Sequence, residues 1–321
     1  MDWSHFGMTR LPFRPGVDTG AYFPASSHEA ARAGLVAAFA RRDPVVLLDG
    51  GYGTGKSLVA WRWLEQLSSA ITRIMLPNIH ATRPADLLQA ILFDLNQPYQ
   101  GMTEQELRLA VMAQLMAAAE TEHPVVLLID EAQHLSHAAI EEVRLLGNIE
   151  ARGGSSLFVV LVALPTLRAA LARPAYEAFA QRVATRCLIE PFSEEESVRY
   201  IRHQIVTAGG DARRAFEEDA IALLAGACGG VPRMLNRAAA LSAEVAAGAG
   251  STSVDVEAVL ESLARLNLTP PEIGEPSQPV IPVRPTEPTR GAGGRGRGAK
   301  NAAEPSPVPG TKQKAAKKRS A

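Results

Sequence analysis

The sequence is poor in cysteine and has no long hydrophobic run. Cys187 and Cys228 are its only cysteines among 321 residues. Two widely spaced thiols form neither a disulfide framework nor a zinc spacing, so we expect both to be buried and reduced. The longest apolar run, from Leu157 to Pro165, is far shorter than the roughly 18 residues that a spanning helix needs. A disulfide-stapled module is excluded, and no integral membrane segment is expected.

The sequence also lacks a secretory signal, because Met1-Asp2-Trp3 begins neither a basic region nor an apolar stretch. We therefore expect a cytoplasmic protein. Its formal net charge is only −1, which shows no bias toward nucleic acid or membrane. Residues 269–321 nevertheless carry a net charge of +6, which leaves −7 on the rest of the chain.

The basic segment 269–321 is rich in proline and glycine and has no aromatic residue. Such a segment cannot bury enough apolar surface to offset its ordering entropy, so we expect a disordered tail. Its arginine–glycine stretch at 290–298 and its basic end at 312–319 are typical of segments that bind DNA or an acidic surface by counterion release. A solubilising tether is the alternative interpretation, and both stay open.

Between residues 44 and 191, short apolar runs alternate with helical patterns. This alternation predicts an α/β domain with a parallel five-stranded sheet and crossover helices. The predicted strands are 45–48, 72–76, 125–129, 157–162 and 187–189, and the predicted helices are 28–41, 56–67, 84–95, 103–119 and 138–149.

After residue 191 only helical periodicity remains. Ser193, followed by three glutamates, is typical of a helix start. The predicted helices are 194–207, 215–226, 232–247 and 254–266. The expected domains are thus 1–43, an N-terminal segment with a first helix; 44–191, the α/β domain; 192–268, a helical lid; and 269–321, the tail.

The strongest motif is a phosphate-binding loop that follows the first predicted strand. Its residues are Gly50, Gly51, Tyr52, Gly53, Thr54, Gly55, Lys56 and Ser57, which fit G-x-x-x-x-G-K-[ST] at every fixed position. The glycines let backbone N–H groups face phosphate oxygens, and a helix N-terminus adds positive potential. Lys56 should reach the β- and γ-phosphates, and Ser57 should bind Mg²⁺. The motif predicts binding of ATP with Mg²⁺.

A second motif lies at the end of the third predicted strand, where Asp130 and Glu131 follow five apolar residues. Charged side chains should emerge at the carboxyl edge of the sheet, where α/β folds bind ligands. Asp130 is then placed to hold Mg²⁺ through water, and Glu131 to act as general base on the attacking water. The sequence therefore predicts an ATP hydrolase.

Together these motifs resemble AAA+ ATPases, in particular the group typified by general secretion pathway protein A, which is similar to origin-recognition and transposition ATPases. Four further strings over residues 3–267 carry the resemblance: His5-Phe6-Gly7-Met8-Thr9-Arg10-Leu11-Pro12-Phe13, Asp130-Glu131-Ala132-Gln133, Gln181-Arg182-Val183 and Gly229-Gly230-Val231-Pro232-Arg233.

The resemblance implies roles for residues outside the two motifs. Arg233 would be the sensor-2 arginine that touches the γ-phosphate of its own chain. Arg182 would be the arginine finger for a neighbouring subunit in a homo-oligomer, with Arg186 as the alternative. Asn78 would restrain the catalytic glutamate. His28 and Tyr22 would flank the adenine.

Two departures from the family accompany the resemblance. The fourth strand is followed by Ala163-Leu164-Pro165 instead of G-Q-P, so Leu164 supplies no polar sensor-1 side chain, and Asn148 or Gln133 would have to substitute. We also expect neither the transmembrane helix nor the peptidoglycan-binding domain of the membrane-bound members. Slow turnover, and no role in gripping cell wall, are therefore expected.

Three functions are compatible with these features. The first is an oligomeric ATPase that couples nucleotide state to a protein client. The second is a transposition-type regulator in which ATP drives assembly on DNA. The third is a nucleotide-binding scaffold with little turnover. Glu131 argues against the scaffold and Leu164 argues for it.

Overall fold

A computed structural model of the chain describes residues 3–120, 125–151 and 154–270. The basic tail and the predictions made for it lie outside these residues. None of the helices in the described ranges has the length and apolarity that crossing a bilayer requires.

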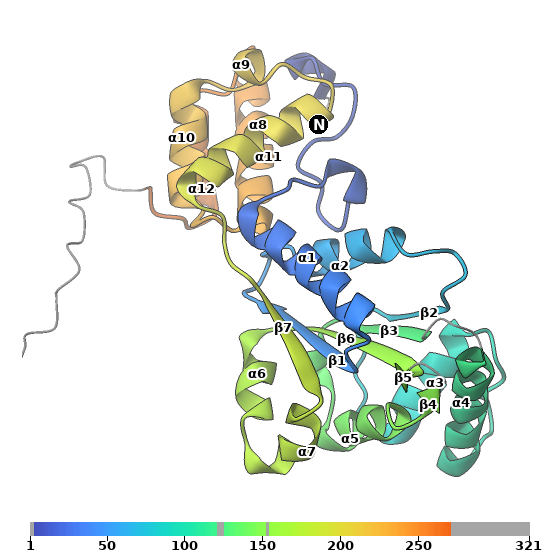
Figure 1. The fold of residues 1–321 in the computed structure, drawn as a ribbon. Helices are drawn as coiled ribbons and strands as arrows, with labels where there is room; N and C mark the ends of the chain where they lie inside the picture. Colours follow the sequence, from blue (N-terminus) through green and yellow to red (C-terminus); the bar gives the residue numbers. More distant parts are fainter. Residues whose placement is uncertain (1–2, 121–124, 152–153, 271–321) are drawn as a thin grey trace, which may run out of the picture. The chain divides into compact units, whose positions relative to one another are not determined.

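The centre of the α/β part is a five-stranded parallel sheet, as predicted. The strand order is β2-β3-β6-β1-β7 (Figure 1). The two strands that precede the sequence motifs, β1 and β3, therefore lie on either side of β6. The strands are β1 (Val45–Gly50), β2 (Arg73–Leu76), β3 (Val125–Ile129), β6 (Leu157–Ala163) and β7 (Val183–Ile189).

Helices cover both faces of this sheet (Figure 1). Side chains alternate along a strand, so Leu47 enters one core with α3 to α7, while Leu48 enters the other core with α1 and α2. Burial on both faces explains why the central strands are continuous apolar runs. The helices are α1 (Ser26–Arg41), α2 (Lys56–Glu65), α3 (Pro84–Asp94), α4 (Glu104–Ala119), α5 (His137–Leu146), α6 (Pro165–Leu171) and α7 (Glu177–Ala180). Two 3-10 turns, η3 (Ala132–His134) and η4 (Pro174–Tyr176), lie between them. A separate antiparallel pair consists of β4 (Glu150–Ala151) and β5 (Gly154–Ser155).

The helical part forms a separate core after β7. Its first helix begins at the predicted start, with a capping box: the Ser193 hydroxyl accepts from the Glu196 N–H at 3.1 Å, and the Glu196 carboxylate accepts from the Ser193 N–H at 3.1 Å. The helices are α8 (Glu194–Thr207), α9 (Ala212–Ala215), α10 (Glu218–Ala227), α11 (Pro232–Gly248) and α12 (Val256–Arg265).

The N-terminal segment packs into the core of this distant helical part. The buried side chains of Trp3, Phe6 and Phe13 join it, and the Phe13 ring lies 6.0 Å from that of Phe216. The segment contains the 3-10 turns η1 (Trp3–Phe6) and η2 (Thr19–Ala21), after which α1 returns to the sheet. The first forty residues thus connect both cores, which sequence periodicity did not indicate.

Two elements begin three or four residues away from their predicted starts. The last strand begins at Val183 instead of 187, because β7 is an edge strand whose half-buried and exposed positions carry the polar residues Thr185 and Arg186. The second helix of the helical part begins at Glu218 instead of 215. The preceding residues form α9, and Phe216 pairs with Val254 in an isolated β-bridge.

Candidate functional site

The loop between β1 and α2 has the backbone that a phosphate cradle requires. Gly53 and Gly55 have φ angles of +69° and +96°, which L side chains rarely adopt. At Gly53 an added Cβ would also lie 2.7 Å from the Cβ of Arg233. Glycine is therefore needed both for the turn and for the close approach of α11.

His28 fixes one peptide of this loop from outside. Its Nε2 lies 2.8 Å from the Thr54 carbonyl oxygen, which can only accept, so Nε2 carries the proton. In a trans peptide the C=O and the next N–H point in opposite directions, so the Gly55 N–H faces away from His28. His28 thereby orients a donor of the phosphate cradle. His28 itself is only 2% exposed, and its place beside an adenine stays a prediction.

Burial lowers the pKa of His28, against the effects of the Thr54 carbonyl and of Glu196 and Glu29. The same burial leaves Nδ1 without a hydrogen-bond partner among the described residues. A neutral ring with its proton on Nε2 fits both observations. Tyr22, the other residue expected near adenine, donates instead to the Glu29 carboxylate at 2.7 Å.

Lys56 is part of the phosphate loop and is also the first residue of α2. Its side chain is largely buried, and Nζ donates to the Gly51 carbonyl at 2.7 Å. Burial lowers its pKa, while the carboxylates of Glu131 and Asp130 act in the opposite direction. The lysine is thus held at the loop by one neutral acceptor and by two nearby negative charges.

The two acids follow β3 at the same edge of the sheet as the loop, because β1, β6 and β3 are parallel neighbours. Asp130 is 9% exposed, and its Oδ1 accepts from the Glu131 N–H at 2.9 Å. The Asp130 carboxylate and the Ser57 hydroxyl are oxygen donors of the kind that Mg²⁺ prefers. The donor set therefore fits a magnesium ion.

Glu131 has a strained backbone and a tethered side chain. Its φ of +53° lies in the left-handed region, where non-glycine residues are uncommon and gather at functional sites. Its Oε2 accepts from the side-chain amide of Gln133, whose Oε1 accepts from the Leu164 N–H at 3.1 Å. Gln133 thus joins the end of β3 to the end of β6.

A cavity of about 850 Å³ opens over these residues. Its size is within the range of small-molecule sites, roughly 300–1,000 Å³. The loop supplies Tyr52, Lys56 and Ser57, β3 is followed by Glu131, and α11 supplies Arg233. The N-terminal segment 11–17 lines another part of the cavity. Sequence reasoning did not place that segment at the cavity, although the first string of the family resemblance, residues 5–13, overlaps it.

Arg233 lies where α11 meets the loop. Its N–H donates to the Gly53 carbonyl at 3.3 Å, and its side chain lines the cavity together with Lys56 and Glu131. The structure therefore brings together the loop, the strand acid and the arginine of the helical part.

Arg182 lies at the other end of the parallel strands, away from the phosphate loop. It directly precedes β7, whose first residue, Val183, pairs with Val45, whereas the phosphate loop begins beside the last residue, Ile189. Its guanidinium donates to the Gly147 carbonyl at 3.1 Å and to the Asn148 side chain. Neither Arg182 nor Asn148 can therefore reach the cavity of its own chain.

Asn78 lies at the same edge of the sheet as Glu131, because Leu76 at the end of β2 pairs with Ile129 at the end of β3. It follows β2, has a φ of +55° and is exposed. Within the described part of the chain it forms no hydrogen bond, so its restraining role stays a prediction. Leu164 is buried, and its aliphatic side chain cannot form a hydrogen bond. Its contact with the site is therefore through its backbone N–H.

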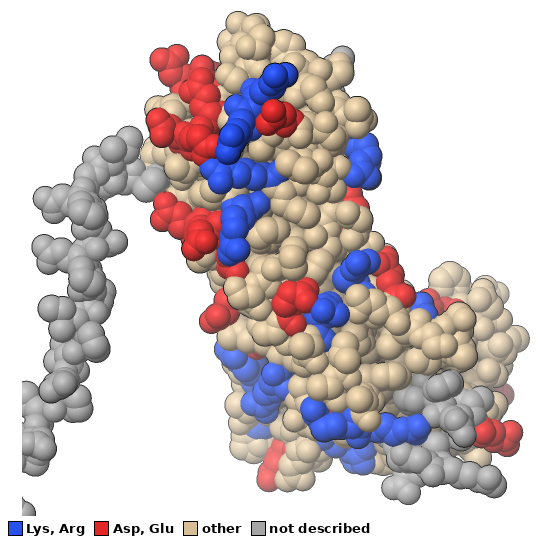
Figure 2. Space-filling model, turned by 45° about the horizontal axis from the view of Figure 1, so that its top comes forward, with Lys and Arg blue, Asp and Glu red and all other residues tan. Residues whose placement is uncertain are grey.

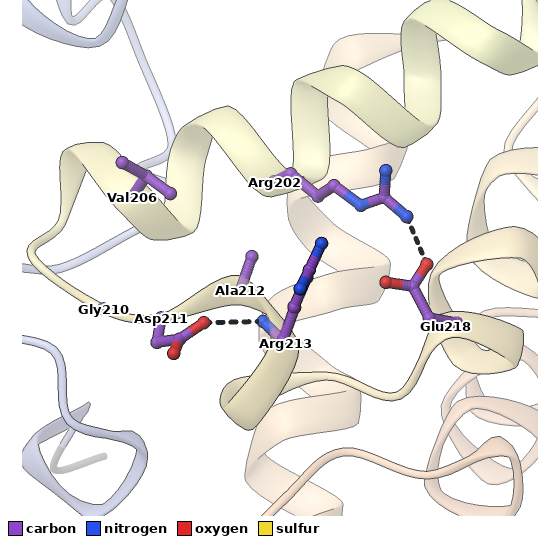
Figure 3. Close-up of a pocket in the computed structure, with 7 residues that line it drawn as sticks. All are labelled: Arg202, Val206, Gly210, Asp211, Ala212, Arg213 and Glu218. Atoms are coloured by element: carbon purple, nitrogen blue, oxygen red, sulfur yellow. Dashed lines mark hydrogen bonds and ion pairs between the residues drawn. The ribbon is translucent and has the colours of Figure 1, made fainter.

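A second hollow, of about 490 Å³, lies on the helical part (Figure 3). Arg202 pairs there with Glu218, and the Arg213 N–H donates to Asp211 at 3.0 Å. The lining holds two arginines and two acids, so it has no surplus of one charge for a ligand. Over the residues with assigned positions, no group of three His, Cys, Asp or Glu side chains could hold a metal.

Comparison with known protein families finds a domain match and a relative. The family described as "AAA domain" matches residues 40–171. General secretion pathway protein A of Aeromonas hydrophila is 31% identical over 234 residues, which are 72% of this chain and 42% of that protein. The chain therefore spans less than half the length of this relative.

Solved structures show the same fold at low sequence identity. Cdc6p of Pyrobaculum aerophilum aligns with a TM-score of 0.64 and 16% identity, covering 83% of this chain and 71% of that one. ORC2 of Aeropyrum pernix, solved as ADPNP–ADP complexes, aligns with a TM-score of 0.60 and 16% identity, covering 82% and 71%. The RuvB branch migration motor of Thermotoga maritima aligns with a TM-score of 0.50 and 17% identity, covering 79% and 73%.

Proposed function

Because the chain belongs to the AAA+ P-loop family and is similar to general secretion pathway protein A, we propose that it binds ATP with Mg²⁺ and hydrolyses it. The observation that carries this proposal is the single cavity that holds Lys56, Ser57, Glu131 and Arg233. These side chains come from the phosphate loop, the end of β3 and the start of α11. Their convergence supplies phosphate binding and a base in one place.

The proposed reaction follows from the chemistry of these groups. The backbone N–H groups of the loop, with Lys56, bind the β- and γ-phosphates. Ser57 and Asp130 hold Mg²⁺, which when bound neutralises charge on the phosphate oxygens. Glu131 accepts a proton from the attacking water, and the water oxygen bonds to the γ-phosphorus. The bond from the γ-phosphorus to the bridging oxygen breaks, which leaves ADP and phosphate.

Arg233 adds a positive charge from the helical part. It lies at the start of α11 against the loop, so a γ-phosphate contact would draw α11 toward the nucleotide, and loss of that phosphate would release it. Nucleotide state would thereby be coupled to the position of the lid.

The test of hydrolysis uses Glu131→Gln, which keeps the side-chain size and removes the base. Turnover of Mg-ATP should fall at least roughly 100-fold, because a positioned general base contributes about 10²–10⁴ to rate. Binding of a fluorescent ATP analogue should stay within twofold. The control is Glu195→Gln on α8, whose carboxylate is 84% exposed.

Two results would contradict the proposal. A Glu131→Gln protein with wild-type turnover would remove Glu131 from the reaction. A wild-type protein that binds Mg-ATP with no measurable turnover would leave the nucleotide-binding scaffold as the function. Lys56→Ala tests nucleotide binding by itself, because this variant should bind ATP more weakly, whereas Glu131→Gln should lose turnover and keep binding.

Coupling to DNA is the second candidate function. It is favoured by the net charge of +6 on residues 269–321 and by the fold shared with ORC1 of Aeropyrum pernix, solved in complex with DNA. Figure 2 shows basic and acidic side chains side by side over the helical part of the face drawn, so the tail is the proposed contact. Salt-sensitive DNA binding that is lost on deletion of residues 290–321 would support it.

A further inference from the structure

The polar contact between the ends of β3 and β6 is unusual because the residue that follows β6 has an apolar side chain. Leu164, which follows β6, has an aliphatic side chain that is 4% exposed. It contributes only its backbone N–H, and the residue after it is Pro165, which has no N–H to contribute. The hydrogen bond that links this end of β6 to the site comes from the Leu164 N–H.

Gln133 receives this N–H, and the contact fixes which way its amide faces. An N–H can only donate, so the atom of Gln133 at 3.1 Å from the Leu164 nitrogen must be the carbonyl oxygen Oε1. The NH₂ group must then face the other way. It donates there to Oε2 of Glu131, so the orientation is set by chemistry at both ends.

The contact holds Glu131 in a usable position. Glu131 lines the cavity with Lys56 and Ser57 while Gln133 is bonded to it. Only Oε2 is engaged, and Oε1 has no hydrogen-bond partner within the described residues, so one carboxylate oxygen is free for water. A donor to one oxygen restricts rotation of the carboxylate without occupying the other.

We propose that Gln133 is a positioning residue that orients Glu131 toward the attacking water, and that it takes the place of a polar side chain at position 164. The inference rests on the proposed hydrolysis of ATP. Gln133 acts through Glu131 and does not itself contact the nucleotide.

The test compares Gln133→Met with the wild type under saturating Mg-ATP. Methionine keeps the length of the side chain and removes both hydrogen bonds. We expect kcat to fall about tenfold, a part of the roughly 10²–10⁴ that a positioned base contributes. The KM for ATP and the affinity for the ATP analogue should stay unchanged, because the cradle is untouched. Gln105→Met on the exposed start of α4 is the control for the substitution.

A double-mutant cycle separates positioning of Glu131 from any other effect. In the Glu131→Gln background, single-turnover hydrolysis should be unaffected by Gln133→Met, because the group that Gln133 orients is already absent. An equal loss in both backgrounds would overturn the inference. So would an unchanged or raised kcat for Gln133→Met in an active wild-type background. A wild type without turnover would instead refute the proposed hydrolysis, and the inference with it.

Discussion

His28 shows how one buried side chain can determine the geometry of a phosphate loop. Its Nε2–H holds the Thr54 carbonyl, and an added Cβ at Gly55 would lie 2.7 Å from the same nitrogen. Its ring also packs 5.1 Å from that of Phe192, the residue just before the helical part. His28 thus contacts both the loop and the segment that leads to the lid.

The pH dependence of stability should report the protonation of His28. Because burial lowers its pKa in the folded state, the unfolded chain binds the proton first as pH falls. The unfolding free energy should therefore fall from pH 6.5 down to the folded pKa, by up to about 1.4 kcal/mol per pH unit within that window. Above pH 6.5 the contribution is fully present. Urea unfolding at a series of pH values measures it.

His28→Gln is the informative variant, because its amide still donates to Thr54 but does not titrate. It should unfold with a shallower pH dependence than the wild type between pH 5 and 7. His137→Gln is the matched control, since the exposed His137 also has its Nε2 2.8 Å from a carbonyl oxygen, that of Ala175. Equal pH dependence in wild type and His28→Gln would show that His28 does not carry it.

At the scale of elements, the turn between α10 and α11 is constrained by the segment that joins the sheet to the helical part. Gly230 has a φ of +71°, and an added Cβ would lie 1.9 Å from the Phe192 carbonyl oxygen. The Phe192 N–H also donates to the Gly230 carbonyl at 2.8 Å. This close backbone contact sets where α11, and with it Arg233, begins.

Gly230→Ala should destabilise the protein more than Gly229→Ala does. Both positions have positive φ, which costs an L residue roughly 1–2 kcal/mol. Only Gly230 meets backbone, whereas nothing lies within 4 Å of an added Cβ at Gly229. Thermal unfolding of the two variants isolates the clash. Equal melting temperatures would show that the turn adjusts without cost, and that Phe192 does not fix it.

At the scale of the whole molecule, the position of Arg182 constrains how the protein would assemble. Arg182 lies at the sheet edge opposite its own phosphate loop, so as a catalytic arginine it could serve only a neighbouring subunit. Its ties to Gly147 and Asn148 hold the side chain in place. Arg186, within β7, is exposed and is the competing residue.

Mixing two inactive variants tests this arrangement. Arg182→Ala should lose roughly 10³-fold in turnover, as removal of an arginine finger does, and Glu131→Gln should be inactive by itself. Random co-assembly should restore activity at roughly a quarter of the sites, where an intact Glu131 faces an intact Arg182 across a head-to-tail interface. Arg213→Ala, an exposed arginine of the helical part, is the control. If mixing with Glu131→Gln restored activity to Arg186→Ala and not to Arg182→Ala, the arginine finger would be Arg186.

The sequence by itself determined the features that local order decides. The loop from Gly50 to Ser57, the strand before Asp130 and the helix start at Ser193 depend on neighbours in the chain, so spacing and periodicity were sufficient to predict them. The buried parallel strands were also evident, because burial on both faces leaves continuous apolar runs. The edge strand was shortened in prediction, because Thr185 and Arg186 interrupt its apolar pattern.

Only the tertiary structure decided which distant residues meet. His28 and Thr54, or Gln133 and Leu164, come from different elements, and no periodic signal links them. The packing of Trp3 and its neighbours against the helical part is likewise a contact between the two ends of the described chain. Such pairs arise because burial brings whole faces together, and hydrogen-bond partners are then chosen among the polar groups that burial has placed within reach.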